Sequence, residues 1–248
     1  TILEEGASGA HTVGLKQTIL FPFVTLGSLI NFCDCLMSGG TSPEDHSEVG
    51  SSYIHFNYTP NQDKATPSLL GDVPSGVMLN QRPIFLGGQG GLVGPCRLAF
   101  GTIIAAGSVY RKDVPQPGRL VFDGGLKSGS IPFSPGLYRG IRRIVANNLA
   151  YLANLAALKQ WYAQVRAQFV SPDFPQALLE GLLAAVDAAI DERLRQFGRF
   201  CAKLPESARR YRESARESAS DALLQEKAEL AAGWPEMKAI MMQQKDDP

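Results

Sequence analysis

Aliphatic residues recur every six positions in the first half of this chain. The two series are Leu86, Leu92, Leu98 and Ile104, and Val24, Ile30 and Leu36. An α-helix repeats at about 3.6 residues and a simple strand at about two, so neither element produces this period. Hexapeptide units are typical of a parallel β-helix, in which each unit forms one short strand and a turn. We therefore expect a parallel β-helix, with a glycine-rich β-sandwich of accidental spacing as the alternative.

Glycine and charge divide the chain of 248 residues into two parts. Of the 25 glycines, 20 precede Pro132, whereas residues 133–248 carry 16 Lys/Arg and 14 Asp/Glu. A part rich in turns followed by a part rich in charged helix formers indicates two domains. We expect a β-helix domain over residues 1–132 and an α-helical domain over residues 133–248.

The second part has helical periodicity. Ser134-Pro135 has the chemistry of a helix start, and apolar residues then recur at steps of three and four. A second helix is expected over residues 178–201, with Pro205 as an interruption and Trp234-Pro235 as the start of a short final helix. None of these segments has a catalytic pattern.

Composition excludes several classes of protein. With 24 Lys+Arg against 24 Asp+Glu, the chain has no excess positive charge with which to bind a nucleic acid. No apolar run reaches the roughly 18 residues of a membrane span. Four cysteines without zinc-site spacing predict free thiols in the cytoplasm and no metal. Because the sequence begins with Thr1 rather than Met, we expect a piece of a longer protein.

Residues 13–20, 57–73 and 104–114 contain three motifs, VGLKQTIL, NYTPNQDKATPSLLGDV and IAAGSVYRKDV, that resemble those of the hexapeptide-repeat acyltransferases. IAAGSVYRKDV (residues 104–114) is similar to the closing coil of that family, and NYTPNQDKATPSLLGDV (57–73) to its loop of the form NYDGxxKxKTxIGDDV. VGLKQTIL (13–20) is similar to a strand written VELKN. The likeness is to the C-terminal acetyltransferase half of the bifunctional N-acetylglucosamine-1-phosphate uridyltransferases and to UDP-N-acetylglucosamine pyrophosphorylase-related proteins. It implies a left-handed parallel β-helix.

The resemblance also implies a substrate site. In that family a homotrimer binds a sugar phosphate or nucleotide sugar, together with acetyl-CoA, between its subunits. By matching motif, Asn57 and Tyr58 would contact the sugar and Lys16 would pair with phosphate. Lys64 lies one position away from the place of a second family lysine.

The co-substrate acetyl-CoA is expected to lie along the last coil. Ala105 and Ala106 match the segment beside the pantetheine arm, where small side chains leave room for it, and Arg111 leaves that coil near the phosphate end. Arg97 and Arg82 are further cations with which a phosphate would pair, although solvated surface charge is the alternative for each. GGQGG (87–91) is not a P-loop and predicts a wide turn of the coil.

The general base of the family is missing from its usual place, where this chain has Leu26. Alternation in IHFNY puts His55 and Asn57 on one face of a strand, and His46 lies in the acidic segment 43–48. Both are candidate bases, with a solvated or hydrogen-bonded histidine as the alternative.

Two functions of different classes follow from these observations. The first is a transferase domain of nucleotide-sugar metabolism that uses acetyl-CoA. The second is a non-catalytic β-helix that serves oligomerisation or regulation as an appendage of a pyrophosphorylase-like enzyme.

Overall fold

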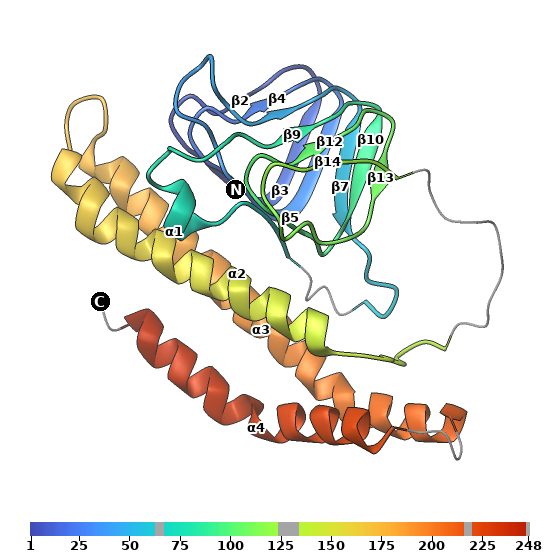
Figure 1. The fold of residues 1–248 in the computed structure, drawn as a ribbon. Helices are drawn as coiled ribbons and strands as arrows, with labels where there is room; N and C mark the ends of the chain where they lie inside the picture. Colours follow the sequence, from blue (N-terminus) through green and yellow to red (C-terminus); the bar gives the residue numbers. More distant parts are fainter. Residues whose placement is uncertain (63–66, 124–133, 216–219, 247–248) are drawn as a thin grey trace.

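The computed structural model describes residues 1–62, 67–123, 134–215 and 220–246. Short strands form the first part and long helices the second (Figure 1). The strands are β1 (Ile2–Leu3), β2 (Ser8–Gly9), β3 (Val13–Leu20), β4 (Thr25–Leu26), β5 (Ile30–Met37), β6 (Glu48–Val49), β7 (Tyr53–Asn57), β8 (Ser68–Leu70), β9 (Phe85–Leu86), β10 (Gly90–Gly94), β11 (Arg97–Leu98), β12 (Ile103–Ile104), β13 (Val109–Tyr110) and β14 (Leu120–Val121). The helices are α1 (Val73–Gly76), α2 (Arg142–Gln160), the π-helical η1 (Trp161–Val165), the 3₁₀-helical η2 (Arg166–Phe169), α3 (Gln176–Ala215) and α4 (Asp221–Asp246).

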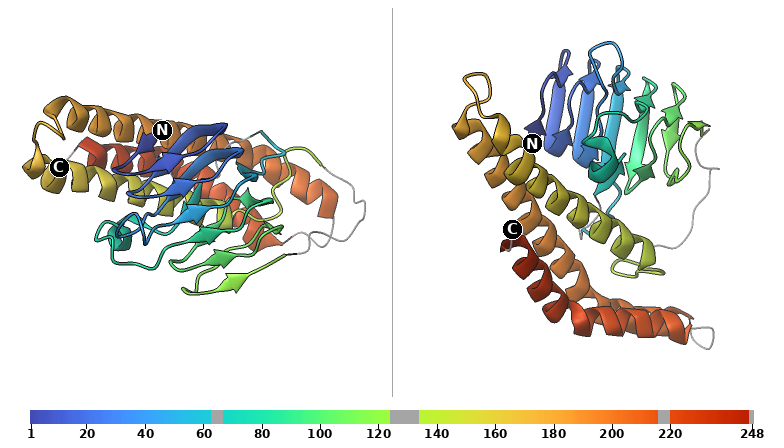
Figure 2. Two further views of the ribbon diagram at one scale, coloured as in Figure 1. Left: turned by 90° about the horizontal axis from the view of Figure 1, so that it is seen from above. Right: turned by 60° about the vertical axis from the view of Figure 1, so that its left-hand side comes forward.

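The strands form two parallel sheets that the chain visits in turn. Sheet A has the order β1-β3-β5-β7-β10-β13, with β8 and β11 attached beside β5, and sheet B has the order β2-β4-β6-β9-β12-β14. Paired residues lie 17 positions apart at Ile2↔Ile19 and 18 apart at Phe85↔Ile103. The chain therefore forms stacked coils, whose sheet A strands lie side by side in Figure 2. The predicted parallel strands and helical C-terminal region are confirmed.

Each coil has three sides because the long strands turn a corner. Gln17 in β3 and Asp34 in β5 have φ of 50° and 52°, in the left-handed region. Before this corner β5 pairs with β7, at Ile30↔Tyr53, and after it with β8, at Leu36↔Leu69. Sheet B is the third side. Three ladders of parallel strands thus run along the stack.

The residues at six-residue spacing fill the interior of the coils. Leu86, Leu92, Leu98 and Ile104 lie in β9, β10, β11 and β12 and are buried in one hydrophobic cluster. The prediction that they face inward is confirmed. Leu36 differs, because it belongs to a second cluster, under the helices, and its neighbours in β5 face the interior instead.

One outward row of side chains decides how far the helices cover the stack. We call it the outer row, and its members, in ladder order, are Ile2, Ile19, Leu36, Leu69, Arg97 and Asp113. The four apolar members belong to the hydrophobic cluster that contains residues of α2 and α3. Burial of apolar surface holds the helices there, and the cover ends where the row becomes charged.

Helices α2 and α3 form a layer on that side of the stack. In Figures 1 and 2, α2 and α3 run antiparallel across it, and α4 returns along the side of α3 away from the strands. Helix α2 begins at Arg142 rather than at Ser134, because Gly136 has φ of 75°, which an α-helix does not accommodate.

The sequence analysis expected Pro205 to interrupt the helical pattern and Trp234-Pro235 to begin a short final helix, and both expectations are wrong. Pro205 lies inside α3 and Pro235 inside α4. Each proline lacks the backbone N–H that would bond within the helix, and the packing of the neighbouring side chains offsets this loss. Leu204 is fully buried beside Pro205, and the Trp234 ring lies 4.9 Å from that of Phe197.

The predicted domain boundary at residue 132 lies outside the described residues. Strand and helix residues share one hydrophobic cluster, so the two parts pack as one body. Among the helices that the structure describes, none combines the length and apolar character needed to cross a membrane.

Candidate functional site

His55 belongs to a polar cluster inside the coils. Its Nε2 lies 2.8 Å from Oγ of Ser68, whose hydroxyl donates to Oδ1 of Asn57 at 3.4 Å. The backbone N–H of Cys96 donates to the same Oγ at 3.0 Å. A Cβ at Gly94 would lie 2.3 Å from Asn57 Oδ1 and 2.5 Å from Ser68 Oγ, so only glycine fits beside this cluster.

This environment keeps His55 neutral and away from solvent. The side chain has no exposed surface, and the Phe32 ring contacts it edge to face at 5.7 Å. Burial lowers the pKa of His55 to about 4, against a smaller opposite effect of the Cys33 backbone. A general base must reach the proton that it removes. In this closed cluster His55 has no surface from which to do so, and its contacts are those of a hydrogen-bonded interior residue.

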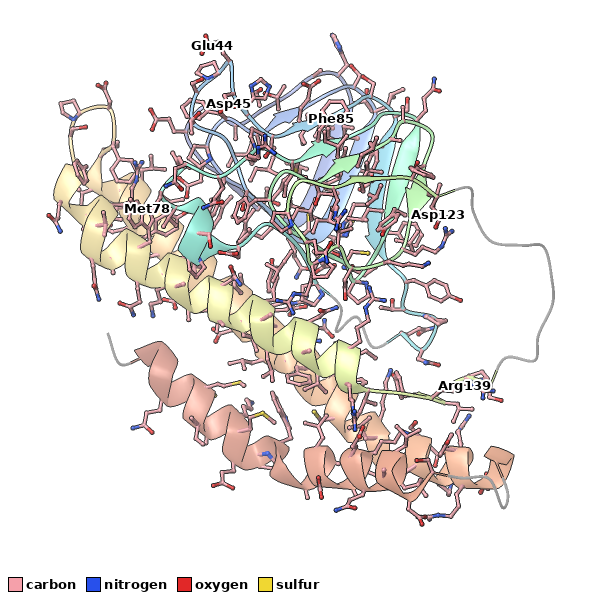
Figure 3. The ribbon with its side chains drawn as sticks, viewed as in Figure 1. Glu44, Asp45, Met78, Phe85, Asp123 and Arg139 are labelled. Atoms are coloured by element: carbon pink, nitrogen blue, oxygen red, sulfur yellow. The ribbon has the colours of Figure 1, made fainter. Side chains whose placement is uncertain are left out.

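His46 occupies a different part of the fold. It lies in the loop between β5 and β6, where Thr41 Oγ1 donates to Oδ2 of Asp45 at 3.0 Å. Figure 3 shows Glu44 and Asp45 of this loop on the side of the stack away from the helices. His46 therefore precedes a strand of sheet B, whereas His55 lies within sheet A.

Most of the other sequence-predicted binding residues lie along one edge of sheet A. Lys16 is exposed immediately before the corner in β3, and Asn57 ends β7 and donates from Nδ2 to the carbonyl of Asp34 at 3.5 Å. With β5 between them, these residues are two strands apart, about 10 Å at the usual strand spacing. Tyr58 follows with 63% of its surface exposed. Lys64 lies outside the described residues.

The same edge continues to the last coil. Phe56 pairs with Val93, and Tyr110 pairs with Leu92, which places Arg111 one position beyond that pair, next to Val93. Arg111 donates from Nη1 to the Val109 carbonyl at 3.0 Å. One row across the strands, near the corner where the chain leaves this side of the coil, consists of Lys16, Cys33, Phe56, Val93 and Arg111. We call this row, together with Asn57 and Tyr58, the sheet A edge. It carries a cation at each end and, between them, the exposed Phe56 ring.

Ala105 and Ala106 lie on another corner, immediately after β12. A Cβ at Gly87 would approach the backbone N of Ala106 to 2.3 Å, so these coils are in close contact at the corner. The wide turn predicted for residues 87–91 is thus a place of tight coil-to-coil packing. The structure does not bring these alanines to the sheet A edge.

Helix α3 contributes two residues that the sequence analysis did not identify. Arg193, with 4% of its side chain exposed, pairs with Asp34 at 2.9 Å, and Glu192 lies beside it. Both line a cavity of about 250 Å³ between α3 and the first coils, together with Gln17 and Tyr151. Because 159 positions separate Asp34 from Arg193, no local pattern in the sequence links them.

The cysteines and the possible metal ligands were compared with the geometry that a thiol nucleophile or a metal site requires. The four cysteines are free, and burial raises the pKa of the Cys96 thiol to about 12, which keeps it protonated. Within the described residues no group of three or more metal-ligating side chains occurs.

No protein-family model matches the chain, and no curated protein is similar enough to it to be matched. The assignment of the candidate site residues therefore rests on their positions in the fold.

Proposed function

We propose that this chain is a left-handed parallel β-helix of nucleotide-sugar metabolism that binds a sugar phosphate or a UDP-sugar at the sheet A edge. The observation that carries the proposal is the stack of three-sided coils, in which the β1–β3, β3–β5, β9–β12 and β10–β13 partners are 17 or 18 positions apart, the length of three hexapeptide units. This architecture agrees with the resemblance to hexapeptide-repeat acyltransferases. Transfer of an acyl group from acetyl-CoA is the reaction that the same resemblance implies.

The residues of the edge suit such a ligand. The Lys16 ammonium is a point charge for a phosphate, and the exposed Tyr58 ring offers an apolar face. Asn57 uses Oδ1 toward Ser68 and one Nδ2 hydrogen toward the Asp34 carbonyl, and its second Nδ2 hydrogen is the donor for a sugar substituent. Lys16 and Arg111 are four strands apart, about 19 Å at the usual spacing. They are therefore too far apart to hold one phosphate, and Arg111 would serve the phosphates of a second molecule, acetyl-CoA.

Calorimetry with UDP-N-acetylglucosamine and N-acetylglucosamine 1-phosphate tests the binding site. Lys16→Gln is expected to weaken binding at least tenfold, whereas Lys238→Gln, which removes an equally exposed charge from α4, leaves binding unchanged. Asn57→Ala is expected to weaken binding as well, provided that its unfolding transition stays cooperative. Equal affinity of the Lys16→Gln and parent proteins for both ligands excludes the edge as the sugar site.

Release of free thiol from acetyl-CoA in the presence of glucosamine 1-phosphate tests the reaction. Turnover that is lost in His46→Ala and kept in His55→Gln would assign the base to the β5–β6 loop. The reverse result requires the interior cluster to open during the reaction. Binding without turnover supports the second candidate function.

The burial of His55 favours that second candidate, a non-catalytic module of a UDP-N-acetylglucosamine pyrophosphorylase-like enzyme. A surface for association is present on sheet B, where Phe85, Ile103 and Leu120 lie in register and are 39%, 44% and 62% exposed. Phe85 is labelled in Figure 3. A homotrimer would cover such a row. Sedimentation analysis of the parent and of Ile103→Lys measures this; a monomeric parent excludes assembly through sheet B.

Cytoplasmic location is part of the same proposal. Four free thiols suit a reducing compartment.

A further inference from the structure

A cleft of about 540 Å³ opens where the helices stop covering the stack. It lies between the charged end of the outer row, the loop after β8 and helix α2, around the corner of the coil from Val93 and Arg111 of the sheet A edge. Its lining includes Asp72, Gln81, Arg97, Phe100, Pro115 and Pro117. This volume lies within the range of about 300–1,000 Å³ that is usual for small-molecule sites.

Arg97 is the unpaired cation of this cleft. It is exposed, and its guanidinium makes no ion pair with any described residue. The neighbouring carboxylate is already engaged, because Asp113 Oδ1 accepts from the backbone N–H of Arg97 at 2.9 Å and from Arg143 Nη2 at 3.0 Å. A guanidinium with five free donors next to an occupied carboxylate favours an anionic partner from solution.

The walls of the cleft are fixed and largely apolar. The Phe100 ring lies against Gly71 and Gly76, where an added Cβ would come to within 2.9 and 3.4 Å of it. Pro115 and Pro117, both exposed, also line the cleft and add rigid rings to it. Asn154 holds α2 in place through Oδ1, which accepts from the Val73 N–H at 2.5 Å.

Two further polar residues line the cleft, the negatively charged Asp72 and the neutral Gln81. Asp72 uses Oδ1 to cap α1, accepting from the Ser75 N–H at 2.7 Å, and its carboxylate repels an anion from that side. Gln81 adds a half-buried amide.

We propose that this cleft binds a small organic phosphate, with the phosphate on the Arg97 guanidinium and a ring or apolar body against Phe100 and the two prolines. The site is separate from the sheet A edge and does not depend on the function proposed there. A guanidinium also binds carboxylates, so the two anions are separated by the choice of probes.

Phenyl phosphate is the test ligand, with inorganic phosphate, phenol and benzoate as comparisons, and binding is followed by calorimetry on the full chain. Phenyl phosphate is expected to bind at least tenfold more tightly than inorganic phosphate or phenol. Arg97→Gln is expected to lose at least tenfold in affinity, and Phe100→Leu to lose the preference for phenyl phosphate over inorganic phosphate.

Lys112→Gln is the matched control, because it removes the same charge from an exposed position in the neighbouring coil that does not line the cleft. It is expected to change affinity less than twofold. Equal losses in Arg97→Gln and Lys112→Gln would mean general charge attraction and would overturn the proposal. Benzoate that binds more tightly than phenyl phosphate would overturn the phosphate assignment.

Discussion

The buried His55 should make this protein sensitive to mild acid. In the unfolded chain the imidazole has its usual pKa of 6.5, and in the folded chain burial lowers that pKa to about 4. Between these two values the unfolded state binds more protons than the folded state. The free energy of unfolding therefore rises with pH in this window, and stability is lost as the pH falls from 6.5 toward 4.

The size of the effect follows from the same two values. At about 1.36 kcal/mol per pH unit, the separation between 6.5 and about 4 corresponds to roughly 3 kcal/mol. About 2 kcal/mol of this is already lost at pH 5, where the unfolded imidazole is almost fully protonated and the folded one is not. The imidazole is fully buried, so solvent does not screen the effect.

Urea unfolding followed by circular dichroism from pH 7.5 to 4.5, on the parent and on His55→Gln, measures this contribution. Glutamine keeps a hydrogen-bonding group near Ser68 and has no proton to gain. The variant is expected to be less stable at pH 7.5. Between pH 7 and 5 its free energy of unfolding should fall by about 2 kcal/mol less than that of the parent. Glu4, whose pKa burial raises, acts in the opposite direction in both proteins and cancels in the comparison. Parallel pH profiles of the two proteins would refute the role assigned to His55.

Two further predictions concern packing. Gly87→Ala should destabilise the fold by about 2 kcal/mol or more, because the new Cβ meets the Ala106 backbone at 2.3 Å. Gly233→Ala, in α4 with open space around it, should instead raise the melting temperature by adding about 1 kcal/mol of helix propensity; a loss in both variants would contradict the packing analysis. Arg193→Ala should cost about 3 kcal/mol in chemical unfolding because it leaves Asp34 without its ion pair, and Asp34→Asn in the same background should cost little more; fully additive losses would show that the two residues act independently.

The repeat of six residues predicts the interior of the coils because an inward side chain is required once per side of each coil. That requirement is local, so Leu86, Leu92, Leu98 and Ile104 are correctly placed. It fails at Leu36 because the outward face of β5 is also buried, under helices that come more than a hundred residues later. A period in the sequence does not show which of two covered faces a residue occupies.

The site was harder to predict for the same reason. Alternation correctly places His55 and Asn57 on one face of β7, but it does not show which face points into the coil. From their hydrophobic side chains, Ile54 and Phe56 would be expected to face the interior. They are instead 50% and 44% exposed, and His55 faces the interior. Ser68 supplies the hydrogen bond that permits this, and it comes from another side of the coil. Such partners are visible only once the ladders are known.

The charged end of the outer row also sets where the stack should open first. Coils that lack the helical layer, from β11 to β14, bury fewer apolar side chains outside their own interior, and they are held to α2 through Arg143, which bonds Asp113 and the Pro95 carbonyl. Because each coil contacts only its neighbours, local unfolding can start at this end without disturbing β3 and β5. Amide hydrogens of β12–β14 should then exchange with deuterium before those of the covered strands. An additional coil would likewise be accommodated at this end without any change in the length of the helices.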